Sequence, residues 1–209
     1  MSERERISSD LLAIEAVQIR PDDPFTWTSG IKSPIYCDNR LTMSYPDIRG
    51  RIRDAFVSHI KELPEKIDII AGCATAGIPH AAFIAESMGL PMVYVRSSSK
   101  KHGKGNQIEG LVKEGDRVVV IEDLISTGKS SINAAKALEG AGAEVVQILA
   151  IFSYGLPAAE EAFGAEGFTY NTLTDFSALL DHMKKQQSFD EQTEAKIWEW
   201  QRDPASFKG

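Results

Sequence analysis

Two adjacent acids followed by a run of small hydroxyl and glycine residues stand out in segment 118–133 of this chain. Glu122 and Asp123 follow the apolar run 118–121, whose β-branched composition is typical of a parallel strand buried on both faces. Open α/β sheets bind their ligands at the carboxyl ends of such strands. Residues 126–130 then open a helix, where free backbone N–H groups and the helix dipole favour a phosphate. The segment therefore predicts a site for a sugar phosphate.

Two other interpretations of this segment are weaker. Gly128, Lys129 and Ser130 end like a nucleotide-binding P-loop, but that motif needs a glycine five positions before Gly128, where Asp123 stands. An ordinary strand–turn–helix with a Ser/Thr cap would explain one hydroxyl. It would not explain two adjacent carboxylates followed by five small or phosphate-binding residues.

Residues 118–130 resemble the phosphoribosyl-pyrophosphate (PRPP) signature of the type I phosphoribosyltransferases. The resemblance implies that the acidic pair holds the ribose hydroxyls, since ionised carboxylates are strong acceptors, and that the following turn wraps the 5-phosphate. It also implies a catalytic role for Asp123. The PRPP contacts implied along this signature are Glu122, Asp123, Leu124, Ile125, Ser126, Thr127, Gly128, Lys129 and Ser130.

A second loop of small residues, 71–79, also joins an expected strand to an expected helix. Gly72 and Gly77 flank it, and small side chains let backbone amides approach a ligand closely. Tight helix–strand packing explains the spacing equally well. In type I phosphoribosyltransferases the matching loop contacts pyrophosphate, which implies contacts from Ala74, Thr75 and Ala76. Orotate enzymes often carry a lysine at the position of Ala76, so this loop is expected to act through its backbone.

The segment 96–110 is long for a loop in a compact domain and is strongly basic in an otherwise acidic chain. A solvated loop is one interpretation; a nucleic-acid patch is disfavoured because no aromatic residues are interleaved. The segment resembles the catalytic loop of orotate phosphoribosyltransferases, which closes over the leaving pyrophosphate in the neighbouring subunit. This implies a homodimer. The implied PRPP contacts are Arg96, Lys100, Lys101 and His102, with Lys100 and His102 catalytic; Ser97 replaces a family lysine.

The segment 25–39 resembles the orotate motif of the same enzymes, with Lys32, Ser33 and Pro34 in place. The resemblance implies that Tyr36 packs against the pyrimidine and that Lys32 and Ser126 also contact orotate. Taken alone, the segment could be an apolar hood. Basic residues that many relatives carry are absent at Thr28 and at 153–155, so the group that holds the orotate carboxylate stays open between backbone amides and Lys32.

The composition of the chain restricts its class. It has 209 residues, of which 43% are hydrophobic, and a formal net charge of −7, which disfavours a nucleic-acid partner. Cys37 and Cys73 show no metal-binding or disulfide spacing. The charged N-terminus does not resemble a signal peptide, and the longest uncharged run, 69–85, is too short to span a membrane. We expect a cytoplasmic protein without membrane partners.

Hydrophobic periodicity predicts the elements that position these segments. Helices are expected at 8–19, 46–63, 77–88, 128–139, 157–163, 175–185 and 191–202, and strands at 67–71, 91–95, 118–121, 144–152 and 168–172, with extended structure in 25–40. The alternation predicts an α/β fold with a central, mostly parallel sheet flanked by helices, as in type I phosphoribosyltransferases. We expect a single domain, 1–209, made of a small N-terminal hood (1–45), an α/β core (46–185) and a C-terminal helix (186–209) that docks through Ile197 and Trp198.

The resemblance implies a magnesium-dependent reaction in which PRPP transfers its phosphoribosyl group to N1 of orotate. Orotidine 5′-monophosphate and pyrophosphate would form, as in de novo pyrimidine biosynthesis. Mg²⁺ would be held mainly by PRPP and water, with Asp123 as the candidate protein ligand. The alternatives are transfer to another base, such as a purine, and a PRPP-sensing regulator without catalysis.

Overall fold

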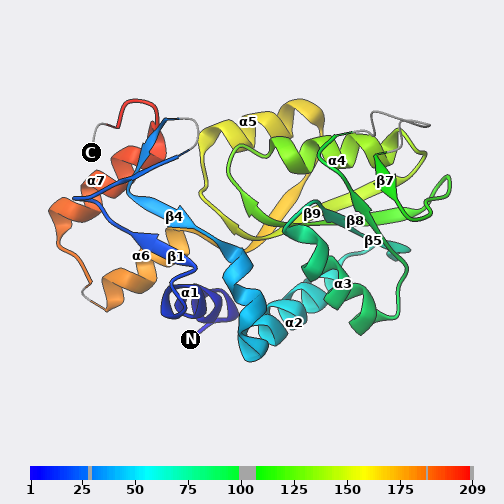
Figure 1. Ribbon diagram of the computed structural model, residues 1–209, viewed down its shortest axis with the longest axis horizontal. Helices are drawn as coiled ribbons and strands as arrows, with labels where there is room; N and C mark the ends of the chain where they lie inside the picture. The colour runs from blue at the N-terminus through cyan, green and yellow to red at the C-terminus, as the bar shows by residue number, and fades with distance from the viewer. Residues whose placement is uncertain (28–29, 99–106, 187, 208–209) are drawn as a thin grey trace.

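The computed structural model describes residues 1–27, 30–98, 107–186 and 188–207, and its centre is a six-stranded sheet (Figure 1). The strands, in spatial order, are β10 (Tyr170–Asp175), β9 (Glu144–Ser153), β8 (Arg117–Ile125), β5 (Ile69–Cys73), β6 (Met92–Val95) and β7 (Ile108–Glu109). All neighbours pair in parallel except β6 and β7. The predicted α/β fold class is confirmed.

Helices cover both faces of the sheet (Figure 1). In β8, Val118 and Val120 belong to one buried cluster, whereas Val119 and Ile121 belong to the other, so the apolar run fills two cores. The helices over the first cluster are α4 (Lys129–Glu139) and α5 (Pro157–Glu166). Those over the second are α1 (Glu3–Ala13), α2 (Pro46–Glu62), α3 (Gly77–Met88) and α6 (Phe176–Lys185). This double burial explains why the strand sequence does not alternate with polar residues.

The N-terminal segment and the C-terminal helix lie together at one end of the molecule (Figure 1). Short antiparallel pairs join β1 (Val17–Ile19) to β4 (Ile35–Cys37) and β2 (Phe25–Thr26) to β3 (Lys32–Ser33). Trp200 of α7 (Glu191–Arg202) is fully buried, with its ring centroid 5.7 Å from Trp27 and 5.8 Å from Tyr154. Ile197 docks as predicted. Trp198 also docks, with its ring centroid 5.4 Å from that of Phe176, although it stays partly exposed; Trp200, one helical turn from Ile197, is a further, fully buried anchor of α7.

Most expected elements differ by up to three residues from their observed bounds, and two differ by more. The helix predicted at 8–19 is wrong in its second half, because α1 spans Glu3–Ala13 and the chain turns at Glu15 (φ +57°) into β1. The helix starts early because Ser2 and Glu5 form a reciprocal capping box that apolar spacing does not reveal. Strand β8 also runs past the expected residue 121, so both acids lie within the strand, and α4 begins only at Lys129.

No helix in the described ranges is both long and apolar enough to cross a bilayer. Cys37 and Cys73 are free and buried. Burial raises the pKa of both thiols well above the usual value, which keeps them protonated and poorly nucleophilic.

Close approach of α3 to β8 requires glycine at the start of that helix. A Cβ on Gly77 would lie 2.4 Å from the carbonyl oxygen of Ile121 and 3.3 Å from the Cα of Glu122. A Cβ on Gly72 would lie 2.9 Å from the Cα of Ile78. Both glycines therefore have a packing role, and Gly77 presses the end of the 74–76 loop against the strand that carries the acids.

We expect Gly77→Ala to lower the free energy of unfolding by about 1–3 kcal/mol, because the added methyl group must displace backbone of β8. Denaturant unfolding measures the change. Gly50→Ala is the matched control: a Cβ there meets no atom within 4 Å, and alanine in a helix interior should stabilise by about 0.5–1 kcal/mol. A Gly77→Ala protein as stable as the wild type would contradict the close approach.

Candidate functional site

The candidate site lies where the strand order of the sheet reverses. From β5 the chain moves outward through β6 and β7, and then returns to place β8 on the other side of β5. The loops that leave the carboxyl ends of β5 and β8 therefore diverge and leave a crevice between them. A cavity of about 370 Å³ lies there. Its lining residues are Cys37, Asp38, Arg40, Ala74, Thr75, Ala76, Glu122, Asp123, Leu124 and Ser130.

Glu122 is a buried acid, with 5% of its surface exposed, and it organises the end of β8. One carboxyl oxygen accepts a hydrogen bond from the backbone N–H of Asp123 at 3.0 Å. The other accepts from the hydroxyls of Ser130 at 2.9 Å and Ser131 at 3.4 Å, both on α4. Burial, and then the neighbouring charge of Asp123, raise the pKa of Glu122 to about 8. Glu122 thus ties the strand to the helix that follows it and is largely protonated at pH 7.

Asp123 is the acid held in place from both sides. Burial raises its pKa too, while a hydrogen bond from Glu122 opposes that shift. Its backbone carbonyl accepts a hydrogen bond from the amide nitrogen of Asn39 at 2.6 Å. Asn39 is fully buried and begins the short 3₁₀ helix η1 (Asn39–Ser44), so the hood is joined directly to the acidic pair. With the shared proton on Glu122, Asp123 carries the negative charge that can accept a ligand hydroxyl or hold a cation.

The turn between β8 and α4 has the conformation that a phosphate site needs. Gly128 caps the helix with φ +76°, and a Cβ there would lie 2.5 Å from the ring of Phe163, so only glycine fits. No side chain caps α4, which leaves its first-turn N–H groups available to an anion. Ser126 and Thr127 precede Gly128 in this turn, whereas the side chain of Ile125 is buried in the core. Ile125 can therefore meet a ligand only through its backbone.

A second cavity, of about 250 Å³, adjoins the first and shares Ala74 and Ser130 with it. Arg96 and Lys129 line it and make it positively charged. Arg96 lies 3.7 Å from Glu109, so its position is supported from β7. Lys100, Lys101 and His102, predicted to act with Arg96, lie outside the described residues, as does Thr28.

None of the residues predicted to contact the base, Lys32, Tyr36 and Ser126, lines either cavity. Tyr36 is 38% exposed, and its ring packs 5.4 Å from that of Phe25. Lys32 Nζ donates a hydrogen bond to the hydroxyl of Thr26 at 2.9 Å. Sequence reasoning missed Asp38, Asn39 and Arg40, which directly follow the hood strand and do reach the site. The signal in the sequence that could have identified them is a run of polar residues directly after an apolar strand.

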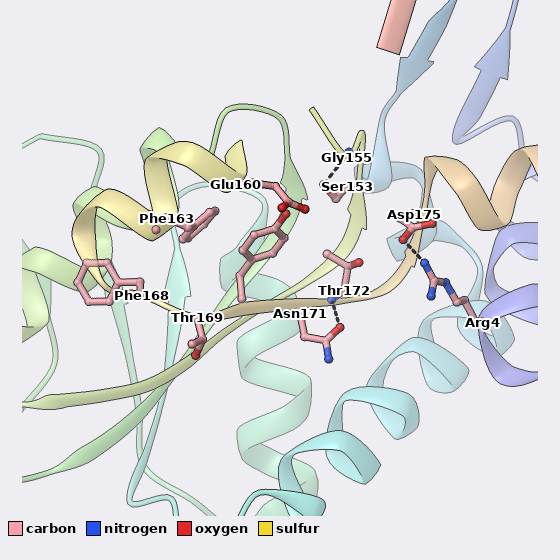
Figure 2. A pocket seen from close by; sticks show the side chains of 12 residues that line it. Arg4, Ser153, Gly155, Glu160, Phe163, Phe168, Thr169, Asn171, Thr172 and Asp175 are labelled. Carbon is pink, nitrogen blue, oxygen red and sulfur yellow. Dashed lines mark hydrogen bonds and ion pairs between the residues drawn. The ribbon is translucent and has the colours of Figure 1, made fainter. Parts of the chain in front are cut away.

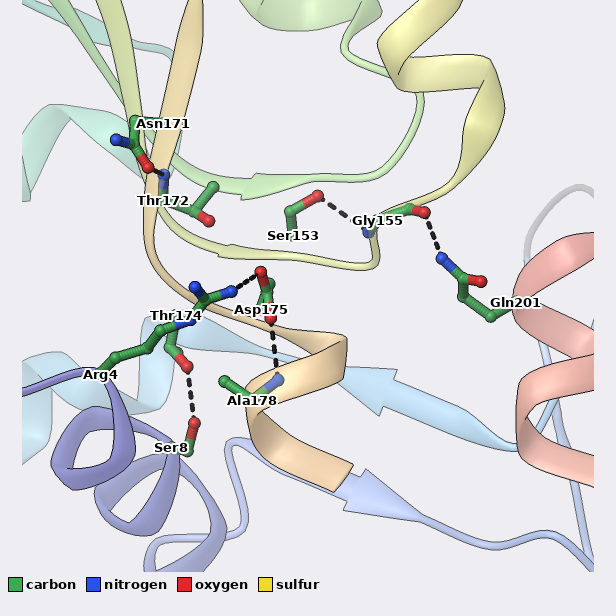
Figure 3. A network of polar contacts seen from close by, with 10 residues as sticks. All are labelled: Arg4, Ser8, Ser153, Gly155, Asn171, Thr172, Thr174, Asp175, Ala178 and Gln201. Carbon is green, nitrogen blue, oxygen red and sulfur yellow. Dashed lines mark hydrogen bonds and ion pairs between the residues drawn. The ribbon is translucent and has the colours of Figure 1, made fainter. Parts of the chain in front are cut away.

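A larger cavity, of about 450 Å³, lies at the edge strand β10 (Figure 2). Its lining residues include neither the acidic pair nor the turn 126–130. Arg4 forms an ion pair there with Asp175, which also caps α6 by accepting from the N–H of Ala178 at 2.9 Å (Figure 3). Ser8 and Thr174 share a buried hydrogen bond of 2.6 Å. These polar groups are paired with one another, so the cavity is a seam that joins α1 to the sheet.

Comparisons with known proteins agree with this geometry. The model of the phosphoribosyl transferase domain matches residues 44–164. An orotate phosphoribosyltransferase of Enterococcus faecalis is 52% identical over 202 residues, covering 97% of this chain and 96% of that protein. The chain belongs to the orotate phosphoribosyltransferase family.

Other members of the orotate phosphoribosyltransferase family support the same assignment. The Staphylococcus aureus MSSA476 enzyme is 54% identical over 194 residues, covering 93% of this chain and 96% of that protein. The solved orotate phosphoribosyltransferase of Aeropyrum pernix superposes with a TM-score of 0.75 at 25% identity, covering 88% of this chain and 99% of that chain. The predicted family and fold are therefore confirmed.

The raised pKa of Glu122 makes a prediction about stability and pH. The pKa of Glu122 in the folded chain, about 8, lies above its usual value of 4.5, so between these pH values the unfolded chain loses a proton that the folded chain keeps. This group therefore stabilises the fold fully below pH 4.5 and loses that contribution as the pH rises to 8.

Glu122→Gln removes that titration while keeping a side chain of similar shape. We expect the melting temperature of the variant, relative to wild type, to rise steadily from pH 5 to pH 8 and then to level off. Thermal unfolding across this range measures the gap. A difference that does not change with pH would show that Glu122 titrates normally.

Proposed function

We propose that this chain transfers the phosphoribosyl group of PRPP to N1 of orotate, giving orotidine 5′-monophosphate and pyrophosphate in de novo pyrimidine biosynthesis. The observation that carries the proposal is 52–54% identity to orotate phosphoribosyltransferases over almost the full chain. The acidic pair and the phosphate turn at the switch point supply the chemistry that this reaction needs.

PRPP is proposed to lie along β8 and the start of α4. Glu122 and Asp123 would together hold the ribose hydroxyls. Asp123 would accept their hydrogen bonds, and Glu122, whose oxygens accept bonds from Asp123 N–H and from α4, would fix the backbone of Asp123. The turn 126–130 would hold the 5-phosphate with its backbone N–H groups and hydroxyls. Leu124 and Ile125 would contribute through their backbone. Ala74, Thr75 and Ala76 line the same cavity and are proposed to face the pyrophosphate.

Catalysis is proposed to rest on positioning and electrostatics. Breaking the bond from C1 to pyrophosphate develops positive charge on the ribose and negative charge on the leaving group. Asp123, with its charge beside the ribose, would stabilise the first. Basic residues would stabilise the second: Arg96, which lines the adjoining cavity, together with Lys100, Lys101 and His102. Of these, Lys100 and His102 are proposed to be catalytic.

Magnesium fits this arrangement as an ion that arrives with PRPP. In the described part of the chain, no three His, Cys, Asp or Glu side chains are grouped so that they could hold a metal by themselves. The Asp123 carboxylate lines the cavity, and a hard cation that prefers oxygen ligands could share it. When bound, Mg²⁺ would neutralise charge on the pyrophosphate oxygens. Asp123 would orient the ribose beside it.

The base is proposed to lie on the hood side of the ribose, against Tyr36, with Lys32 and Ser126 as further contacts. The Tyr36 ring is exposed enough to receive a planar ligand. We further propose a cytoplasmic homodimer in which the 96–110 segment serves the neighbouring site. The division into hood, core and C-terminal helix stays a prediction.

Loss of orotate absorbance on addition of PRPP and Mg²⁺ tests the activity. We expect turnover with orotate, none with purine bases, and loss of turnover when a chelator is added. Asp123→Asn should lower kcat/KM by about 10²–10³-fold, because the charge beside the developing ribose cation is removed. Wild-type protein that binds PRPP but consumes no orotate would overturn the proposal.

Sharing of sites between subunits has its own test. A Lys100→Ala chain and an Asp123→Asn chain should each be nearly inactive, because one lacks the loop cation and the other the ribose acid. If the loop acts across the interface, a mixed dimer contains one intact site and should recover part of the wild-type rate. Separately tagged chains purified as heterodimers allow the measurement, and no recovery would argue that the loop acts within its own subunit.

A further inference from the structure

We propose that Arg40 binds the carboxylate of the pyrimidine substrate and thereby decides between orotate and bases that lack this group. The inference rests on the proposed function, which supplies a base with a carboxylate. Lys32, the cation considered from the sequence for this role, does not line the main cavity.

Charge in the main cavity favours this role. Three carboxyl groups line the cavity, from Asp38, Glu122 and Asp123, and Arg40 is the one cationic side chain among its described lining residues. An anionic base that enters this cavity is repelled by the charges of Asp38 and Asp123 unless a cation offsets them. Arg40 is the lining residue that can do so.

The guanidinium of Arg40 is held so that one of its edges stays available. Asp38 accepts hydrogen bonds from Nε at 2.6 Å and from Nη2 at 2.7 Å, and also from the backbone N–H of Arg40 at 3.1 Å. Within the described ranges, Nη1 and the second N–H of Nη2 have no hydrogen-bond partner. Those two nitrogens form the outer edge of the fork, which matches the two oxygens of a carboxylate.

Arg40 also has a fixed place relative to the sugar site. Its chain neighbour Asn39 is fully buried and donates to the backbone carbonyl of Asp123 at 2.6 Å, so η1 is tied to the strand that carries the acids. The Tyr36 hydroxyl and Asp123 both lie near enough to Arg40 to raise its pKa, after the larger effect of Asp38. Arg40 therefore lies near both the proposed base contact, Tyr36, and the proposed ribose contact, Asp123, and it shares the cavity lining with the latter.

Two other arrangements compete with this one. Lys32 is a second cation on the hood, but it does not line the cavity and its ammonium is bonded to Thr26. Residues 74–76 share the cavity with Arg40, so pyrophosphate could meet the same guanidinium. The experiment must separate a carboxylate contact from a pyrophosphate contact.

Steady-state kinetics of Arg40→Gln separates them. We expect KM for orotate to rise roughly 10- to 100-fold, as for loss of a charge-assisted bidentate contact, while KM for PRPP stays within about twofold. Arg40→Lys keeps the charge but not the planar fork, so its KM for orotate should lie between those of the wild type and Arg40→Gln. Arg53→Gln is the matched control, because Arg53 pairs with Asp54 on α2 and lines neither cavity; it should behave as wild type.

Competitive inhibition by orotidine 5′-monophosphate and by UMP isolates the carboxylate, since the two nucleotides differ only in that group. Arg40→Gln should weaken inhibition by orotidine 5′-monophosphate by the same factor by which KM for orotate rises. Inhibition by UMP should stay unchanged, which would also show that the site is intact. The proposal would be overturned if Arg40→Gln weakened binding of both nucleotides equally, or raised only KM for PRPP. It would also be overturned if Lys32→Gln, and not Arg40→Gln, selectively weakened binding of orotidine 5′-monophosphate. Wild-type protein without turnover of orotate would overturn the proposed function itself, which is a separate result.

Discussion

Direct pairing of β5 with β8 at the centre of the sheet is the constraint on which the rest of the molecule depends. The two strands come from different halves of the α/β core, and their carboxyl ends bring the 74–76 loop and the acidic pair to one crevice. Gly72 and Gly77 let α3 pack closely over this pair, because side chains there would strike α3 or the backbone of β8. A wider separation would move the 74–76 loop away from Glu122 and Asp123, which line the same cavity.

The acidic pair illustrates how burial assigns different tasks to neighbouring carboxyl groups. Glu122 is buried beside Asp123, and two charges in so small a volume repel each other, so the pair retains a proton near neutral pH. The protonated partner is anchored to serines of α4, which sets the distance between the strand and the phosphate turn. Asp123 keeps its charge for the ligand. A site built this way needs little rearrangement when PRPP binds.

The hood is held in place by the C-terminal helix and by strand β8. Trp200 of α7 packs against Trp27 of the hood and against Tyr154 after β9, so the C-terminal helix fixes the hood to the sheet. Asn39 then fixes it to the acidic pair. Hood and C-terminal helix thus form one support beside the acidic pair, although they lie at opposite ends of the sequence.

The sequence by itself determined those elements and site residues that depend only on neighbouring residues. The apolar run of β8, the acids, the glycine of the phosphate turn and the bounds of α3 and α7 follow from residues near one another in sequence. Tertiary structure decided what depends on distant contacts. Burial of Glu122, the full burial of Trp200 and the position of Arg40 beside Asp123 arise from packing between distant segments. Trp27 and Trp200, for example, are 173 positions apart in the sequence. Hydrophobic periodicity shows which face of an element is apolar, but not which other element covers that face. The covering element determines the pKa of a buried group such as Glu122 and decides whether a side chain such as Arg40 can reach a ligand.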